Sequence, residues 1–152
     1  MITGGASAGD YDFVLQAAAD CGVSAVFHKI KQRPGKPLFF GRRDSKLVFG
    51  LPGNPASVLT CYYEYVAPTL AQLSNKPSGL QKLNVPLKKS FKKNAGLTHF
   101  LKGWYDGKTA EVLQAQESYR LSSFANANCL IQIDEAVSVC EAGCVVEIHL
   151  LA

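Results

Sequence analysis

The sequence predicts an α/β unit followed by a small all-β, barrel-like unit, and two observations support this prediction. Helix and strand patterns alternate along the first half of the 152-residue chain, whereas the second half holds only short strand patterns. The change falls at Asn75-Lys76-Pro77-Ser78-Gly79, whose composition is typical of a linker. We therefore expect one unit over residues 1–76 and a second over residues 80–152.

The first unit is expected to be the later part of an α/β sandwich. Met1-Ile2 reads as the end of a strand, and because two residues are too few to hold a sheet, we expect the chain to begin inside a domain. A helix is predicted from Asp10 until Gly22 stops it. The other predicted elements are strands at Val23–Ile30, Pro37–Gly41 and Leu47–Leu51, and a long helix from Pro55 that Pro68 kinks or interrupts.

The second unit is predicted to contain six short strands. In the last of them, apolar positions such as Val146 and Ile148 alternate with Glu147 and His149. Asp106-Gly107 is a favourable hairpin turn. The predicted strands are Leu83–Leu87, Leu97–Tyr105, Thr109–Leu113, Cys129–Ile133, Val137–Cys140 and Cys144–Leu151.

The composition, 47% hydrophobic and 18% charged, is that of a globular protein with a net charge of +4. The basic group between Lys29 and Lys46 indicates an anionic ligand, and the group between Lys82 and Lys93 is interpreted as a solvated loop. Nucleic acid is disfavoured because no reader motif is present, and no apolar run has the length that spans a membrane. Five cysteines lack the spacing of a disulfide framework, so reduced, cytoplasmic thiols are expected.

The stretch Arg33–Ser57 is the clearest candidate for a binding site. It holds two Pro/Gly-rich turns, of which the first ends at Lys36. The second ends at Asn54-Pro55, interpreted as a helix N-cap followed by proline at the first helical position. Such a helix start points N–H groups toward an anion. With a third glycine-rich turn at Thr3–Gly9, these turns are expected along one edge of the sheet, where α/β proteins bind ligands.

Four segments together resemble a known family. They read T-G-G-A-S-A-G-D-Y-D, F-H-K-I-K-Q-R-P-G-K-P, F-G-L-P-G-N-P-A-S and Q-E-S-Y-R-L-S-S-F-A-N-A-N. In order and spacing they resemble the C-terminal half of the molybdopterin molybdenumtransferases, the MoeA family, known as the E domain in gephyrin. The resemblance covers essentially the whole chain. It implies the later part of a MogA-like three-layer sandwich, followed by the family's C-terminal β-barrel, domain IV.

The resemblance also implies a function in molybdenum cofactor biosynthesis. Family members insert molybdate into adenylylated molybdopterin and release AMP, with a divalent metal for which Mg²⁺ is expected. They act as homodimers in the bacterial cytoplasm, and neither nucleic acid nor a membrane is an expected partner. The family's N-terminal domains are absent from this sequence. We therefore expect the full-length protein to be the transferase and this chain alone to be inactive.

The site residues implied by the resemblance fall into three groups. The expected catalytic residues are Asp12, Lys29, Arg33 and Lys36, with Asp12 also the candidate metal ligand. Molybdate is expected to contact Arg33, Lys36, Ser57 and Ser118. Molybdopterin is expected to contact Gly4, Gly5, Ser7, Asp12, Pro52, Gly53, Asn54, Pro55 and Ser57. A tetrahedral dianion suits such ammonium, guanidinium, hydroxyl and helix-start N–H groups.

Two positions depart from the family pattern. Arg33 stands where the family usually has lysine, which keeps the charge but changes the geometry. Leu97 follows Gly96 where the family usually has an arginine for molybdate, so either another basic residue compensates or oxyanion affinity is reduced. Lys102 keeps a charge at the family's second arginine. Leu97 keeps an alternative open, a non-catalytic module that binds a pterin or nucleotide or docks a partner.

Overall fold

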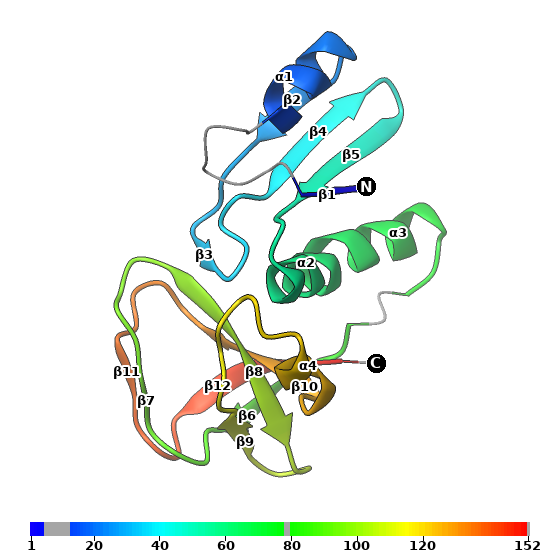
Figure 1. Cartoon of the computed structure of the whole chain (residues 1–152). Helices are drawn as coiled ribbons and strands as arrows, with labels where there is room; N and C mark the ends of the chain where they lie inside the picture. Colours follow the sequence, from blue (N-terminus) through cyan, green and yellow to red (C-terminus); the bar gives the residue numbers. More distant parts are fainter. Residues whose placement is uncertain (5–12, 78–79, 152) are drawn as a thin grey trace.

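The computed structural model describes residues 1–4, 13–77 and 80–151. These residues form two larger β-sheets, one mainly from each half of the chain, with a long helical segment beside them (Figure 1). Among the described residues, none of the helices has both the length and the apolar character needed to cross a membrane.

The first sheet has four strands and follows the predicted order of elements. The Ile30 N–H donates to the Lys36 carbonyl at 3.0 Å, so the chain between them turns away from this sheet. The strand before this turn is therefore shorter than predicted, and the strand after it begins later than predicted. β1 pairs in parallel with β5, and the other neighbours are antiparallel. The spatial order is β1 (Ile2–Thr3), β5 (Lys46–Leu51), β4 (Phe39–Arg43) and β2 (Ser24–Phe27).

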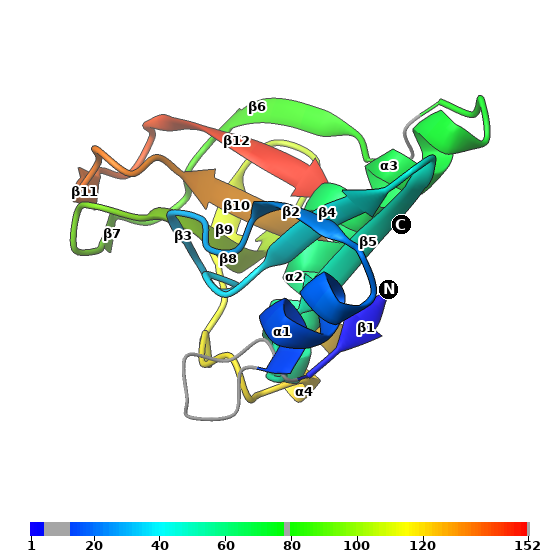
Figure 2. The same ribbon diagram turned by 90° about the horizontal axis from the view of Figure 1, so that it is seen from above.

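Apolar side chains pack on both faces of this sheet, as expected for a three-layer sandwich. On one face, Phe39 packs with Val14 from α1 (Phe13–Asp20). On the other face, Phe40 packs against the cluster that includes Cys61 from α2 (Pro55–Cys61). Phe39 and Phe40 are consecutive in β4 and so point to opposite faces. Helices therefore cover the sheet from two sides (Figure 2).

The long helix is present, and its winding changes before Pro68. It runs as α2, a π-helix η1 (Tyr62–Val66) and α3 (Ala67–Leu73). The Ala67 N–H donates to the carbonyl of Tyr62, five residues earlier. Pro68 has no N–H, and its ring would crowd the carbonyl four residues before it, which explains the wider turn at this point. The predicted effect of Pro68 is therefore seen as a local change of winding, and the helical backbone continues through it.

The second sheet has six strands and is open. Asp106-Gly107 joins β8 to β9 as the predicted hairpin. Leu87, after β6, bridges to Ala110 of β9, so the sheet curves, but the ladder of the described strands does not close into a barrel. The spatial order is β3 (Gln32–Arg33), β8 (Thr98–Tyr105), β10 (Cys129–Ile133), β12 (Val145–Leu150) and β6 (Lys82–Pro86). The sixth strand, β9 (Ala110–Val112), also pairs with β8. A separate two-stranded ladder is formed by β7 (Phe91–Lys92) and β11 (Val139–Cys140).

Two features join the halves that the sequence presents as separate units. β3 precedes the first sheet's main hairpin, yet it pairs in parallel with β8. His149 of β12 lies at a polar position of the alternating pattern, yet it is fully buried, because Glu64 of η1 packs against it. His149 Nδ1 lies 2.7 Å from a Glu64 carboxylate oxygen, and its Nε2 lies 2.7 Å from Glu147. The two halves therefore share a polar, buried contact as well as a strand pairing.

Candidate functional site

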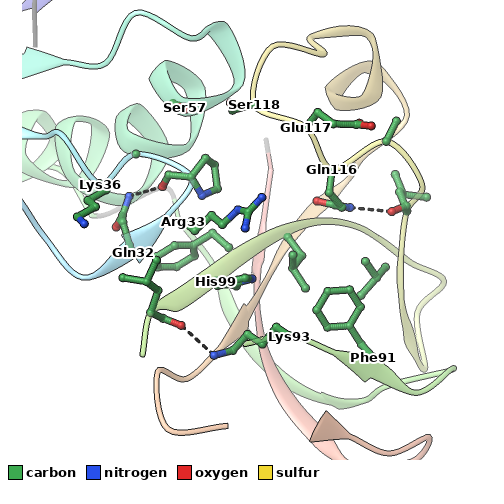
Figure 3. Close-up of a pocket in the computed structure, with 18 of the residues that line it drawn as sticks. Gln32, Arg33, Lys36, Ser57, Phe91, Lys93, His99, Gln116, Glu117 and Ser118 are labelled. Carbon is green, nitrogen blue, oxygen red and sulfur yellow. Dashed lines mark hydrogen bonds between the residues drawn. The ribbon is translucent and has the colours of Figure 1, made fainter. Parts of the chain in front are cut away.

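A cleft of about 1220 Å³ lies between the two halves of the chain (Figure 3). It is walled by the turn after β3, the segment between β5 and α2, the strands β7 and β8, and the loop that leads toward α4 (Ser122–Ala125). Two of the three expected anion-binding turns therefore meet here with a serine from the second half. The expected site residues that line the cleft are Arg33, Lys36, Pro52, Gly53, Asn54, Ser57 and Ser118.

The turn between β3 and β4 is held from its buried side by polar groups. Gln32 Nε2 donates to the Pro34 carbonyl at 2.9 Å, and Gln32 accepts a short hydrogen bond from the Tyr65 hydroxyl. Cys61 Sγ lies 3.8 Å from the Gly35 carbonyl. Burial raises the pKa of Cys61 and that of Tyr65 to about 12, so both groups keep their protons and act as donors. The turn therefore presents a fixed backbone to the cleft.

Gly35 allows this turn to lie directly on α2. Its φ of +93° is in the left-handed region that side chains disfavour. A Cβ at this position would lie 2.5 Å from Cys61 Sγ and 2.7 Å from Gln32 Nε2, both of which are buried. Glycine is thus required by the backbone and by the space, and its presence sets the position of Lys36 at the cleft.

The start of α2 differs from the prediction, because two of its hydrogen-bond donors contact Ser118. Asn54 is the N-cap residue and Pro55 is the first helical residue, but the Asn54 side chain does not cap the helix. Its Nδ2 donates to Ser118 Oγ at 3.0 Å, and the Ala56 N–H donates to the Ser118 carbonyl at 3.1 Å. One of the helix-start donors expected to face an anion is therefore used to hold Ser118, which lines the same cleft as the buried Ser57.

A buried lysine fixes the loop that follows β9 and carries Ser118. Lys102 Nζ donates to the carbonyls of Ala115 and Glu117, at 2.8 and 3.3 Å, and to Ser123 Oγ at 2.5 Å, which uses all three of its protons. Burial lowers the pKa of Lys102. Lys102 keeps a positive group at the position of the family's second arginine, but it does not line the cleft. Its role in this structure is to hold the loop.

The acidic residues of the cleft have basic partners. Glu111 carboxylate oxygens lie 3.5 Å from Lys88 Nζ and 2.5 Å from Lys89 Nζ. A Glu117 carboxylate oxygen lies 3.7 Å from Arg120 Nε. Neither carboxylate therefore offsets the remaining basic groups of the cleft.

Those basic groups give the cleft an excess of positive charge. None of Arg33, Lys36, Lys92 and Lys93 has a carboxylate partner within 4 Å among the residues described. The interpretation of the second basic group as a solvated loop holds for the exposed Lys82 and Lys88, but it is incomplete, because Lys89, Lys92 and Lys93 line the cleft. Such an excess favours an anionic ligand.

The other expected site residues lie elsewhere. Gly4 and Pro55 line an adjoining hollow of about 440 Å³, which shares Gly53 with the main cleft. Lys29 is exposed and does not line the cleft. The predictions for Gly5, Ser7 and Asp12, and the predicted start of the first helix, fall outside the described residues.

Several cleft residues were not among the expected site residues, and His99 and Gln116 are two of them. His99 is 9% exposed and lines the cleft because β3 pairs with β8. The Gln116 side chain accepts a hydrogen bond from the Lys102 N–H at 3.0 Å and donates one to the Lys102 carbonyl at 2.8 Å. It therefore holds the Ser118 loop on β8. Both roles depend on distant pairing, for which the local sequence gives no signal.

The described cleft residues do not by themselves fit a divalent metal. No group of three or more His, Cys, Asp or Glu side chains that could hold a metal ion occurs among the residues described. Mg²⁺ prefers several oxygen ligands, and both cleft carboxylates face basic partners. A role for Mg²⁺ therefore depends on Asp12 and on the family resemblance.

Comparison with known proteins finds two family profiles, one for each half of the chain. The profile described as a probable molybdopterin binding domain matches residues 1–72, and the profile described as the MoeA C-terminal region (domain IV) matches residues 84–151. Together they leave only the segment around the predicted linker and the last residue unmatched.

Individual relatives agree with these profiles. A molybdopterin molybdenumtransferase of Haemophilus influenzae is 32% identical, over 99% of this chain and 40% of the relative. The molybdenum cofactor synthesis protein cinnamon of Drosophila melanogaster is 31% identical, over 91% of this chain and 24% of the relative. The crystal structure of a molybdopterin biosynthesis MoeA protein from Pyrococcus horikoshii matches with a TM-score of 0.77 and 30% identity, over 98% of this chain and 36% of that chain. The chain thus spans well under half the length of these relatives. On these matches, it belongs to the MoeA family of molybdopterin molybdenumtransferases, which serve molybdenum cofactor biosynthesis, and it corresponds to their C-terminal region.

Proposed function

We propose that this chain supplies the substrate cleft of a molybdopterin molybdenumtransferase, which inserts molybdate into adenylylated molybdopterin and releases AMP. The proposal rests chiefly on one observation: Lys36, Ser57 and Ser118, from three separate segments and both halves of the chain, line a single cleft with excess positive charge. The direct bond between Asn54 and Ser118 holds two of these segments together.

The chemistry of the reaction suits this arrangement. Molybdate and the adenylate phosphate are both anions, so bringing them together requires positive charge and fixed hydrogen-bond donors. In the proposed cleft, Lys36 and Arg33 offset the charge of the oxyanion, and the Ser57 and Ser118 hydroxyls orient it. Transfer to a dithiolate depends on such positioning and charge stabilisation more than on a strong base. The fixed turn around Gly35 and the fixed Ser118 loop keep these groups in place before the substrate arrives.

The proposal carries over three further properties from the family resemblance. Mg²⁺ serves as the divalent ion, the full-length protein forms a homodimer, and it works in the cytoplasm. This chain alone binds the substrates without turning them over. Sedimentation analysis of the full-length protein tests the homodimer, and a monomer at micromolar concentration would contradict it.

Thermal unfolding with and without molybdate tests the binding step. A ligand at 100 times its Kd stabilises the folded state by about 2.7 kcal/mol, which raises Tm by roughly 5–10 °C for a domain of this size. We expect this rise for the wild type and for Lys46→Ala, an exposed position away from the cleft, and its loss in Lys36→Ala. Tungstate, of the same shape and charge, is tested in parallel.

A non-catalytic module for a pterin or nucleotide is the second candidate, and Leu97 favours it, since an apolar side chain lines the cleft where the family usually has arginine. Equal melting with and without oxyanion would support this candidate.

The decisive experiment reconstitutes the chain with the upstream part of the Haemophilus influenzae relative and measures molybdenum insertion. No insertion by the reconstituted, folded protein would overturn the transferase proposal.

A further inference from the structure

Arg33, His99 and Lys93 gather at the junction of β3 and β8, in a part of the cleft below Ser57 and Ser118 in Figure 3. The parallel ladder places Arg33 opposite His99. Lys93 reaches the same place because its Nζ donates at 2.8 Å to the carbonyl of Leu97, two residues before His99. Two cationic side chains therefore lie near one imidazole.

The electrostatics of this junction favour an anion. Burial lowers the pKa of His99, and the charges of Lys93 and Arg33 lower it further. The ring is therefore neutral at neutral pH. Neither cation has a carboxylate partner within 4 Å among the residues that the structure describes. Two like charges without a counter-charge raise the energy of the site, and a bound anion would lower it.

All three side chains have hydrogen-bond donors left for a ligand. Lys93 uses its protons on the Leu97 carbonyl and, at 3.5 Å, on the Asn94 carbonyl, which leaves one of three available. The Arg33 guanidinium has five N–H groups and the neutral His99 ring has one. Within the described part of the chain, no side-chain hydrogen bond uses either of them.

We propose that Arg33, His99 and Lys93 form a second anion subsite in the cleft, for a tetrahedral dianion, either a phosphate monoester group or free molybdate. The inference rests on the proposed function, because it places a second anionic group beside the one assigned to Lys36, Ser57 and Ser118, and Arg33 contributes to both sites. Lys93 supplies a positive charge next to Leu97, and the Leu97 carbonyl holds that charge in position. Lys93 and His99 are the residues that this subsite adds to the cleft.

Isothermal titration calorimetry on the 152-residue chain tests the subsite, with inorganic phosphate, AMP and molybdate as separate probes. Low ionic strength is needed because salt screens such contacts. Lys93→Met removes the charge and keeps the length of the side chain. Lys46→Met is the matched control, because Lys46 is exposed and does not line the cleft. A charge-assisted hydrogen bond is worth about tenfold or more in affinity.

We expect Lys93→Met to weaken binding of at least one probe about tenfold, and Lys46→Met to change it by less than about threefold. Lys93→Arg, which keeps the charge, should bind within about threefold of the wild type. Adding Leu97→Arg to Lys93→Met places a new cation in the cleft and should restore most of the lost affinity. The rescue distinguishes lost charge from local unfolding, which a new arginine at position 97 would not repair.

The outcomes separate this inference from the proposed function. Unchanged affinities in Lys93→Met, with molybdate binding lost in Lys36→Ala, would overturn the second subsite and leave the proposed function intact. Binding of phosphate or AMP that depends on Lys93, without molybdate binding by the wild type, would support the subsite and overturn the proposed function. Loss confined to AMP and phosphate identifies a phosphate ester as the ligand, and loss confined to molybdate identifies the free oxyanion. Absence of binding for all three probes would overturn both.

Discussion

Replacing Glu64 with glutamine should weaken the contact between the two halves in a pH-dependent way. Both Glu64 oxygens lie 2.7–2.8 Å from His149 Nδ1, and the two side chains are only 6% and 1% exposed. His149 Nε2 contacts Glu147, which also pairs with Lys82. Ionised carboxylates only accept hydrogen bonds, so this arrangement favours a proton on both ring nitrogens. Burial opposes that charge, but the hydrogen bonds to Glu64 and Glu147 outweigh it and raise the pKa of His149.

The expected loss of unfolding free energy in Glu64→Gln is about 2 kcal/mol at pH 6. Removing one partner of a buried ion pair costs about 3–5 kcal/mol when the other charge is left unpaired. Here the cost is smaller, because Glu147 remains at Nε2 and the glutamine oxygen can still accept from Nδ1–H. The folded-state pKa of His149 lies above the unfolded value of about 6.5. The stabilisation is therefore complete below about pH 6.5 and is lost as the pH rises through the folded-state pKa.

Urea unfolding followed by circular dichroism at pH 6 and pH 9 measures this difference. The difference between wild type and Glu64→Gln should be largest at pH 6 and shrink at pH 9. Glu135→Gln is the matched control, because Glu135 makes an exposed pair with Lys31 at 3.7 Å, which should contribute less than about 1 kcal/mol. An equal loss at both pH values would refute the ionised pair, and a larger loss at pH 9 would reverse the sign of the argument.

Three further substitutions test the walls of the cleft. Gly35→Ala should cost about 3 kcal/mol in urea unfolding and abolish anion binding, because the new Cβ would collide with Cys61 and force the turn outward. Lys102→Met should cost about 2–4 kcal/mol, since it leaves the part-buried Ala115 carbonyl and the buried Ser123 hydroxyl without this donor, and the loop amides should exchange hydrogen faster. Ser118→Ala should change stability by less than about 1 kcal/mol yet weaken molybdate binding severalfold in calorimetry, and an unchanged affinity would exclude the hydroxyl as a ligand.

The elements of the first half could be predicted because their signals are local. Gly22 has the positive φ expected where it ends the first helix, and the winding of the long helix changes just before Pro68, as its missing N–H implies. The pairing of the two Pro/Gly-rich turns at one cleft also follows from the general placement of ligand sites in α/β sheets. The first two predictions depend on a few neighbouring residues, whereas the third depends on the fold class.

Of three residues whose positions differ from the prediction, His149 and Asn54 depend on contacts between the halves, and Lys93 depends on a contact within the second half. His149 has the position of an outward-facing residue in an alternating strand, and only the arrival of Glu64 from η1 buries it. Lys93 belongs to a basic run typical of a solvated loop, and its direction is set by the Leu97 carbonyl. Asn54 has the sequence of a helix cap, but Ser118, 64 residues later, is its partner. Local propensity cannot rank such distant partners against the local ones.

These distant contacts bear directly on how the cleft works. The β3–β8 ladder, the Asn54–Ser118 bond and the Glu64–His149 pair each join the first half to the second. The first two lie at the cleft wall itself, so the relative position of Lys36 and Ser118 is set by the same contacts that join the halves. A small displacement between the halves would therefore separate the groups proposed to bind one oxyanion, although each half kept its own core. Because catalysis of this kind depends on positioning, the contacts between the halves are part of the proposed site and not only of its scaffold.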